Sequence, residues 1–262
     1  MLETPLKTRT VLIIPAAGSS TRLRSSAPKV LSLVNGRPMI DHLLDRYERA
    51  VERFVLVLHP SFEAAVRDHC AAQAPRIDYV QQAEPTGMLD AILLAHDALR
   101  SVTPDRIWIT WGDQIGIHPD TVATLSRLSH EQPDADVIFP TARQSDPYIH
   151  IDRDPDGRII GIRHRREGDA LPPVGESDSG LFSLSPRAYF DRLPQFAREI
   201  AAGDATRERN FLPFIPWLSM TAHQVLTFPC RDDMEAVGIN TPEDRDRVEQ
   251  YLLQRERLTA HR

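Results

Sequence analysis

A loop of small residues followed by two cationic ones comes directly after the first apolar segment of the chain. Ala16, Ala17 and Gly18 leave the backbone bare, so its N–H groups can approach anionic oxygens. Hydroxyl donors follow at Ser19, Ser20 and Thr21. Arg22 and Lys29 can add charge-assisted hydrogen bonds to phosphate. A plain strand-to-helix turn would not need these two cations, so we predict that the loop binds a polyphosphate.

Two oxygen-bearing side chains far apart in the chain could hold a divalent cation. Asp113 follows Gly112 after an apolar segment at 106–111, so a carboxylate is expected at the rim of a sheet. Asn240 lies between a strand-like stretch and a helix start. Either could be an ordinary turn residue. One carboxylate and one amide oxygen suit Mg²⁺, which takes one or two protein carboxylates and completes its octahedron with waters and phosphates.

Strand-like and helix-like segments alternate in the first half of the chain. Apolar runs typical of buried strands lie at 10–15, 54–59, 77–81, 106–111 and 135–140. Apolar residues recur at helical spacing in 39–53, 60–73, 88–99 and 119–131. This order predicts an α/β, Rossmann-like fold with a mixed, mainly parallel sheet flanked by helices. Ligands of such sheets bind at the carboxyl ends of the strands.

The pattern changes after residue 145. We expect a hairpin over 148–152 and 158–164, a long loop over 165–177, a strand at 180–185, a helix at 186–201 and a strand at 224–228. Thr241 as N-cap and Pro242 at the first helical position predict a final helix. The chain is therefore expected to be one domain with an antiparallel insertion. Its nucleotide-binding half would span about 8–145, its acceptor-binding half about 146–240 and its C-terminal helix 241–258.

Composition excludes several classes of protein. The chain has 41% apolar and 26% charged residues and a net charge of −6, which argues against a general nucleic-acid binder. No apolar run approaches the roughly 18 residues of a membrane span, and no signal-peptide segment is seen at the start. Cys70 and Cys230 lack metal-ligand spacing and are expected to be reduced thiols. We expect a cytoplasmic globular protein that does not associate with membranes.

Five motifs in order resemble a known family. They are PAAGSSTRLRSSAPKVL (15–31), VQQAEPTGMLDA (80–91), IWITWGDQ (107–114), ESDSGLFSL (176–184) and EAVGINTPED (235–244). The set resembles nucleotidylyltransferases that act on sugar phosphates, a MobA-like NTP transferase group with a GT-A-like fold. It is most similar to the uridylyltransferase domain of the bifunctional bacterial enzyme that makes UDP-N-acetylglucosamine.

The resemblance implies attack by a phosphate monoester on the α-phosphorus of an NTP, with Mg²⁺ as cofactor and pyrophosphate as leaving group. It implies catalytic roles for Arg22, Lys29 and Asp113, and metal ligation by Asp113 and Asn240. The nucleotide would be bound by Ala16, Ala17, Gly18, Ser19, Ser20, Thr21, Gln82, Gly87, Met88 and Gly112. Gln82 would read the base edge while the base lies flat on Gly87. The acceptor would be bound by Ile149, His164, Glu176 and Asp178.

The sequence departs from that relative at both substrates. Met88 stands where threonine is frequent and cannot donate a hydrogen bond, so the base stays open between UTP and CTP. Ile149, His164 and Asp178 replace a glycine, a glutamate and an asparagine, which indicates an acceptor other than N-acetylglucosamine 1-phosphate. Asp178 could accept hydrogen bonds from a polyol, pair with an amine or be a surface-loop carboxylate. A second cation for the acceptor phosphate is expected among Arg163, Arg165, Arg166, Arg207 and Arg209.

Three alternatives stay beside this interpretation. A CTP-dependent enzyme could use a polyol phosphate, an amino-alcohol phosphate or a phosphonate. A protein without turnover could bind nucleotide sugars as a regulator, although Lys29, Asp113 and Asn240 argue for catalysis. A dinucleotide-dependent oxidoreductase is disfavoured because G-x-G-x-x-G is missing. The expected partners are an NTP and a phosphorylated small molecule, and the sequence is compatible with a homodimer.

Overall fold

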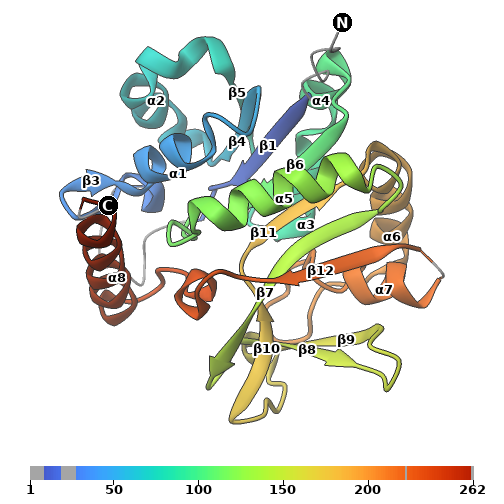
Figure 1. The fold of residues 1–262 in the computed structure, drawn as a ribbon. Helices are drawn as coiled ribbons and strands as arrows, with labels where there is room; N and C mark the ends of the chain where they lie inside the picture. The colour runs from blue at the N-terminus through green and yellow to red at the C-terminus, as the bar shows by residue number, and fades with distance from the viewer. Residues whose placement is uncertain (1–8, 19–27, 222, 261–262) are drawn as a thin grey trace, which may run out of the picture.

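A mixed sheet forms the centre of the fold (Figure 1). The computed structural model describes residues 9–18, 28–221 and 223–260. The sheet strands are β1 (Thr10–Pro15), β4 (Arg53–Leu58), β5 (Ile77–Gln81), β6 (Arg106–Thr110), β7 (Val137–Ser145), β10 (Val174–Asp178), β11 (Leu181–Leu184) and β12 (Val225–Pro229). Parallel pairing joins β6, β1, β4 and β5 in that order, and β12 also runs parallel to β7. Antiparallel β11 pairs with both β6 and β7. The predicted mixed, mainly parallel α/β sheet is confirmed.

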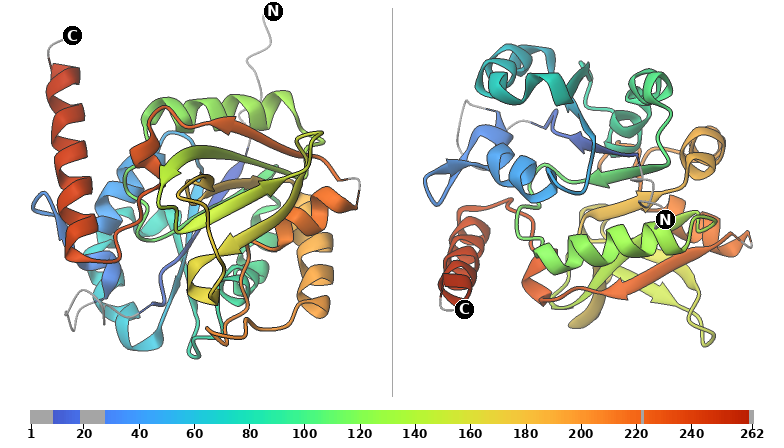
Figure 2. Two further views of the ribbon diagram at one scale, coloured as in Figure 1. Left: turned by 90° about the horizontal axis from the view of Figure 1, so that it is seen from below. Right: turned by 45° about the horizontal axis from the view of Figure 1, so that its top comes forward.

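Helices cover both faces of the sheet because its central strands are apolar on both sides. Leu12 and Ile14 of β1 pack in one core cluster, and Val11 and Ile13 pack in the other. The first cluster includes residues of α1 (Met39–Tyr47), α2 (Pro60–His69), α5 (Pro119–Glu131) and α8 (Pro242–Ala260). The second includes residues of α3 (Met88–Leu94), α4 (His96–Val102), α6 (Leu193–Glu199) and α7 (Phe214–Met220). Figure 2 shows α8 at one edge of the molecule.

Short elements connect these layers. Short 3-10 helices lie at η2 (Lys29–Leu31), η3 (Ala71–Arg76), η4 (Arg165–Glu167) and η6 (Asp233–Ala236), and η5 (Ala188–Arg192) is a π-helix. Two small ribbons pair β2 (Leu33–Val34) with β3 (Arg37–Pro38), and β8 (Ile149–Arg153) with β9 (Ile159–His164). The β8–β9 ribbon is the hairpin that the sequence predicts. None of the helices in the described ranges is both long and apolar enough to cross a membrane.

Local signals account for where the best-predicted helices begin. Pro119 opens α5, whose predicted bounds of 119–131 are confirmed, and the His118 side chain accepts a hydrogen bond from Asp120 N. At α8, Thr241 Oγ1 accepts from Asp244 N at 3.1 Å, while Asp244 Oδ2 accepts from Thr241 N at 2.9 Å. This reciprocal cap confirms the predicted start of the final helix.

Other expected boundaries are wrong. The loop expected over 165–177 contains η4 and then β10, whose backbone pairs with residues 141–145 of a longer β7. The helix expected over 88–99 is divided into α3 and α4 at Ala95, and the helix expected over 39–53 ends at Tyr47. The residues VGESD carry little apolar alternation, so the strand β10 depends on its partner and not on its own sequence.

Candidate functional site

A cavity of about 570 Å³ opens where β1 and β6 end. Pro15 and Ala16 at the end of β1, and Gly112 and Asp113 after β6, line this cavity. Ile149 and other residues of the second half of the chain line it as well. Both halves of the chain therefore contribute to one cavity, at the edge of the sheet where ligands of α/β proteins bind.

Lys29 lies between the two oxygens that the sequence singles out. Its ammonium donates to Asp113 Oδ2 at 2.6 Å and to Asn240 Oδ1 at 3.0 Å. The Lys29 and Asp113 side chains are each 20% exposed, so the pair can still meet a ligand. A carboxylate oxygen and an amide oxygen thus converge on one cationic group, and both are hard donors that fit Mg²⁺. Among the described residues, no group of three or more His, Cys, Asp or Glu side chains is arranged to hold a metal.

Two glycines allow the segments that carry these oxygens to pack closely. A Cβ on Gly112 would lie 3.2 Å from both Pro15 O and Val30 Cγ1. A Cβ on Gly238 would lie 2.8 Å from Gln114 Oε1. Ile239 N also donates to Asp113 O at 3.1 Å, which ties the backbone beside Asn240 to the backbone of Asp113. The Asp113–Asn240 pair is therefore positioned by the main chain.

A buried polar network extends this connection away from the cavity. The Glu235 side chain is fully buried and accepts from His118 N at 2.9 Å, Asp232 N at 2.8 Å and Thr121 Oγ1 at 3.0 Å. Burial is the largest influence on the Glu235 carboxyl and raises its pKa. Gln114 Nε2 donates to Glu235 O at 2.8 Å. Glu235 thus joins the loop after Asp113 to the segment before Asn240.

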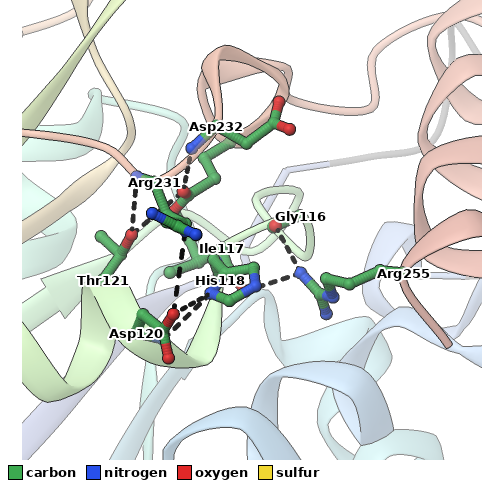
Figure 3. A network of polar contacts seen from close by, with 9 residues as sticks. Gly116, Ile117, His118, Asp120, Thr121, Arg231, Asp232 and Arg255 are labelled. Carbon is green, nitrogen blue, oxygen red and sulfur yellow. Dashed lines mark hydrogen bonds and ion pairs between the residues drawn. The ribbon is translucent and has the colours of Figure 1, made fainter. Parts of the chain in front are cut away.

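Figure 3 shows the outer part of this network. Arg231 N donates to Thr121 Oγ1 at 3.2 Å, and the Arg231 guanidinium lies 3.9 Å from Asp120 Oδ2. Arg255 of α8 donates to Gly116 O at 3.1 Å and to Ile117 O at 3.3 Å. Helix α8 is therefore attached to the same loop that leads away from Asp113.

The structure describes only the two ends of the loop that the sequence predicts to bind phosphate. Ala16 is buried and lines the cavity with Gly18, and Ala16 N donates to Val57 O at 2.8 Å. Ala17 is half-buried and is not among the lining residues. Four predicted site residues lie outside the described residues, and these are Ser19, Ser20, Thr21 and Arg22.

The expected base-reading segment has an internal role in this structure. The buried Gln82 side chain donates to Gly87 O at 3.1 Å and is not among the cavity-lining residues. Gly87 has a φ of 118°, and a Cβ there would lie 2.5 Å from Arg209 N. The need for glycine at this position therefore comes from the Arg209 backbone. Met88 is the member of this segment that lines the cavity.

On the acceptor side, Ile149 and His164 line the cavity as expected. The His164 ring lies edge-on to Tyr148, with centroids 5.2 Å apart. Leu212 N donates to Asn210 Oδ1 at 3.0 Å, which turns the amide nitrogen of Asn210 toward His164 Nδ1 at 3.1 Å. His164 Nδ1 is then an acceptor, and burial lowers the pKa of this imidazole.

Glu176 does not lie where the sequence places it. Its carboxylate pairs with the Arg153 guanidinium through contacts of 2.6 and 2.7 Å, and it is not among the residues that line the cavity. Alternating residues of a strand point to opposite faces of the sheet. On β10, Asp178 and Glu176 share one face, but Asp178 stands at the strand end beside the cavity. The position along the strand, and not the face, separates the two carboxylates.

Asp178 is buried, so the surface-loop interpretation is wrong. It lines the cavity while only 5% exposed. Its Oδ1 accepts from Gly180 N at 2.7 Å, and the Trp111 side chain donates to the same carboxylate. Burial outweighs these hydrogen bonds and raises the pKa of Asp178 from 3.8 to about 6.

Three of the arginines expected at the acceptor phosphate line the cavity, and all three are paired. Arg165 binds the Asp146 carboxylate, Arg166 lies 3.4 Å from Glu208, and Arg209 binds Asp90. The other two candidates, Arg163 and Arg207, are not among the lining residues. Arg247 of α8 lines the cavity and is missing from the sequence-based expectation. Its spacing from Asn240 was the signal that could have found it.

Comparison with known proteins identifies the family of this chain. A family model described as the MobA-like NTP transferase domain matches residues 12–212. The bifunctional protein GlmU of Pseudomonas aeruginosa is 29% identical over 258 residues, which cover 95% of this chain and 52% of that protein. The GlmU of Sorangium cellulosum is 28% identical over 236 residues, covering 87% of this chain and 48% of that protein. The chain spans about half the length of these curated relatives.

A solved structure gives the same fold at lower sequence similarity. It is a putative glucose-1-phosphate thymidylyltransferase from Bacillus anthracis in complex with a sucrose. The TM-score is 0.73 at 15% identity, and the match covers 92% of this chain and 94% of the other. At this identity the likeness concerns the fold alone.

Proposed function

Because the chain belongs to the MobA-like NTP transferase domain family, we propose that it transfers a nucleoside monophosphate from an NTP to a phosphorylated small-molecule acceptor. An acceptor phosphate oxygen attacks the α-phosphorus, the bond from that phosphorus to the bridging oxygen breaks, and pyrophosphate leaves with the electron pair. The observation that carries the proposal is the convergence of Asp113 and Asn240 oxygens on Lys29 inside the cavity.

The chain's own residues would position and neutralise charge. The attacking phosphate is already ionised, so no side chain has to remove a proton. Asp113 and Asn240 would hold Mg²⁺, which when bound supplies positive charge to the phosphoryl oxygens. Lys29 adds a cation beside that pair, and its 2.6 Å contact with Asp113 supports a role in neutralising the charge that develops on the α-phosphate.

The residues that line the cavity limit the range of substrates that we propose. Met88 offers no hydrogen bond to a base edge, so UTP and CTP are both carried forward as nucleotides. Ile149, His164 and Asp178 support an acceptor other than N-acetylglucosamine 1-phosphate. The buried carboxylate of Asp178 favours an acceptor that carries hydrogen-bond donors. This observation supports a second candidate function, a CTP-dependent enzyme that acts on a polyol phosphate, an amino-alcohol phosphate or a phosphonate.

A pyrophosphate-release assay tests the proposal. Each NTP is combined with a panel of sugar phosphates, polyol phosphates, amino-alcohol phosphates and phosphonates, with Mg²⁺ and with chelator. Asp113→Asn and Lys29→Met should each lower the rate on the order of 10²–10³-fold, the usual loss for one well-placed charge-stabilising group. Asp134→Asn, at an exposed position outside the cavity lining, should leave the rate unchanged.

If no NTP–acceptor pair gives metal-dependent release above the Asp113→Asn background, the transferase proposal is wrong. Should the same protein still bind a nucleotide or nucleotide sugar in a thermal-shift measurement, the non-catalytic regulator becomes the better interpretation.

A further inference from the structure

Arg247 lies on the face of α8 that borders the cavity, one turn after Asp244. Asn240, Thr241, Asp244 and Arg247 all line the cavity. Residues spaced by three or four lie one above the other on a helix, so Asp244 and Arg247 form one row on α8, and Asn240 precedes the capping residue Thr241. The Asn240 oxygen lies 3.0 Å from the Lys29 ammonium.

Arg247 differs from the other lysine and arginine side chains that line the cavity in the partner that its charge has. Lys29, Arg165, Arg166 and Arg209 each lie within ion-pair distance of a carboxylate. In the described part of the chain, the polar contact recorded for the Arg247 guanidinium is with Met234 Sδ, 3.9 Å from Nη2.

The carboxylate of Asp244, one turn before Arg247, is already engaged. Asp244 Oδ2 accepts from Asn240 N at 3.1 Å and from Thr241 N at 2.9 Å, which holds it at the start of the helix. Its charge is stabilised there by backbone donors and by the helix dipole. Arg247 is thus a cation on the cavity wall that no carboxylate in the described residues neutralises.

We propose that Arg247 binds a phosphate group of a substrate beside the Asp113–Asn240 pair. The inference rests on the proposed nucleotidyl transfer and adds a residue to it. A planar guanidinium matches two phosphate oxygens at once, and a charged donor makes stronger hydrogen bonds than a neutral one. The phosphate could be that of the NTP or that of the acceptor, and both present the same dianionic oxygens to Arg247.

The test uses two glutamine variants on one helix. Arg247→Gln removes the proposed contact, and Arg245→Gln is the matched control because Arg245 is exposed, pairs with Asp246 at 3.5 Å and is not among the lining residues. For each variant, KM is measured for the NTP and for the acceptor, and Kd is measured for pyrophosphate by calorimetry. Thermal unfolding of both variants checks that they fold like the wild type.

Arg247→Gln should raise the constant of the substrate that carries the phosphate by about tenfold or more, because one charge-assisted hydrogen bond is lost. A higher KM for the NTP together with a higher Kd for pyrophosphate assigns Arg247 to the triphosphate. A higher KM for the acceptor alone assigns it to the acceptor phosphate. Arg247→Lys should recover part of the loss, since it keeps the charge without the two-pronged geometry.

Unchanged constants in Arg247→Gln, or equal changes in Arg247→Gln and Arg245→Gln, would overturn the inference. The pyrophosphate Kd requires no turnover. A wild-type protein that binds pyrophosphate but releases none from any NTP–acceptor pair therefore overturns the proposed function, while the Kd values still decide whether Arg247 binds the phosphates of the NTP.

Discussion

The ionisation of Asp178 should make folding stability depend on pH. Its carboxyl is 5% exposed and its pKa rises from 3.8 to about 6, chiefly because burial disfavours the charged form. A group whose pKa is higher in the folded state stabilises the fold most when it is protonated, below the unfolded pKa of 3.8. That stability is lost as the pH rises through about 6.

The size of this change in the free energy of unfolding follows from the pKa shift of Asp178. A rise of roughly two units corresponds to about 3 kcal/mol, at 1.36 kcal/mol per unit. Most of this change should fall between about pH 4 and pH 7.5. The remainder lies below pH 4, because the carboxyl is already partly ionised in the unfolded chain at pH 4. Asp178→Asn removes the titration while keeping an oxygen that can accept from Gly180 N.

Urea denaturation at several pH values measures the effect. The free energy of unfolding of Asp178→Asn minus that of the wild type should increase by about 2–3 kcal/mol from pH 4 to pH 7.5. Taking the difference cancels the other titrating groups, such as Glu235 and His164, which both variants share. Asp134→Asn, at an exposed position, serves as the control and should give a flat difference. If the Asp178→Asn difference is flat within about 0.5 kcal/mol, burial does not govern this carboxyl and the reasoning fails.

Two other sites give sharp expectations. Gly87→Ala should lower the free energy of unfolding by about 2 kcal/mol or more in urea denaturation, because its Cβ would meet the Arg209 backbone at a positive φ. Gly157→Ala, with φ 82° and no atom within 4 Å of the added Cβ, should cost about 1 kcal/mol, and equal costs would contradict the packing argument. Glu235→Gln should lower stability by about 2 kcal/mol, since an amide cannot accept from all the donors that meet this carboxylate. It should also raise the Mg²⁺ concentration needed for half-maximal pyrophosphate release, whereas the exposed control Glu243→Gln should change neither quantity.

The sequence predicts best what local chemistry decides. The first strand, Thr10–Pro15, and the helix Pro119–Glu131 have their predicted bounds because an apolar run and an N-terminal proline act within a few residues. The motifs also place Lys29, Asp113 and Asn240 at one cavity, where the structure brings them into contact. Their catalytic and metal-binding roles stay predictions.

The sequence fails where a residue's role depends on a distant partner. The residues Val174–Asp178 show no local strand pattern. They form a strand because their backbone pairs with the end of β7. Asp178 is predicted to bind the acceptor or to be a surface-loop carboxylate, and only the pairing of β10 shows that it is buried beside Trp111. The sequence assigns no role to Glu235, because two of its three donors, His118 N and Thr121 Oγ1, come from residues 117 and 114 positions earlier in the chain.

The contact between Gly87 and Arg209 joins the predicted base-reading segment to the second half of the chain. Arg209 N donates to Thr86 O at 2.8 Å, Leu89 N donates to Arg209 O at 3.0 Å, and the Arg209 guanidinium binds Asp90. Met88, the cavity-lining residue of the predicted base-reading segment, is therefore held in place by a segment from the second half of the chain. Asn210, the next residue, contacts His164, so one stretch of backbone supports two cavity-lining side chains. Under the proposed function, in which Met88 faces the nucleotide and His164 the acceptor, this stretch would support residues that contact both substrates.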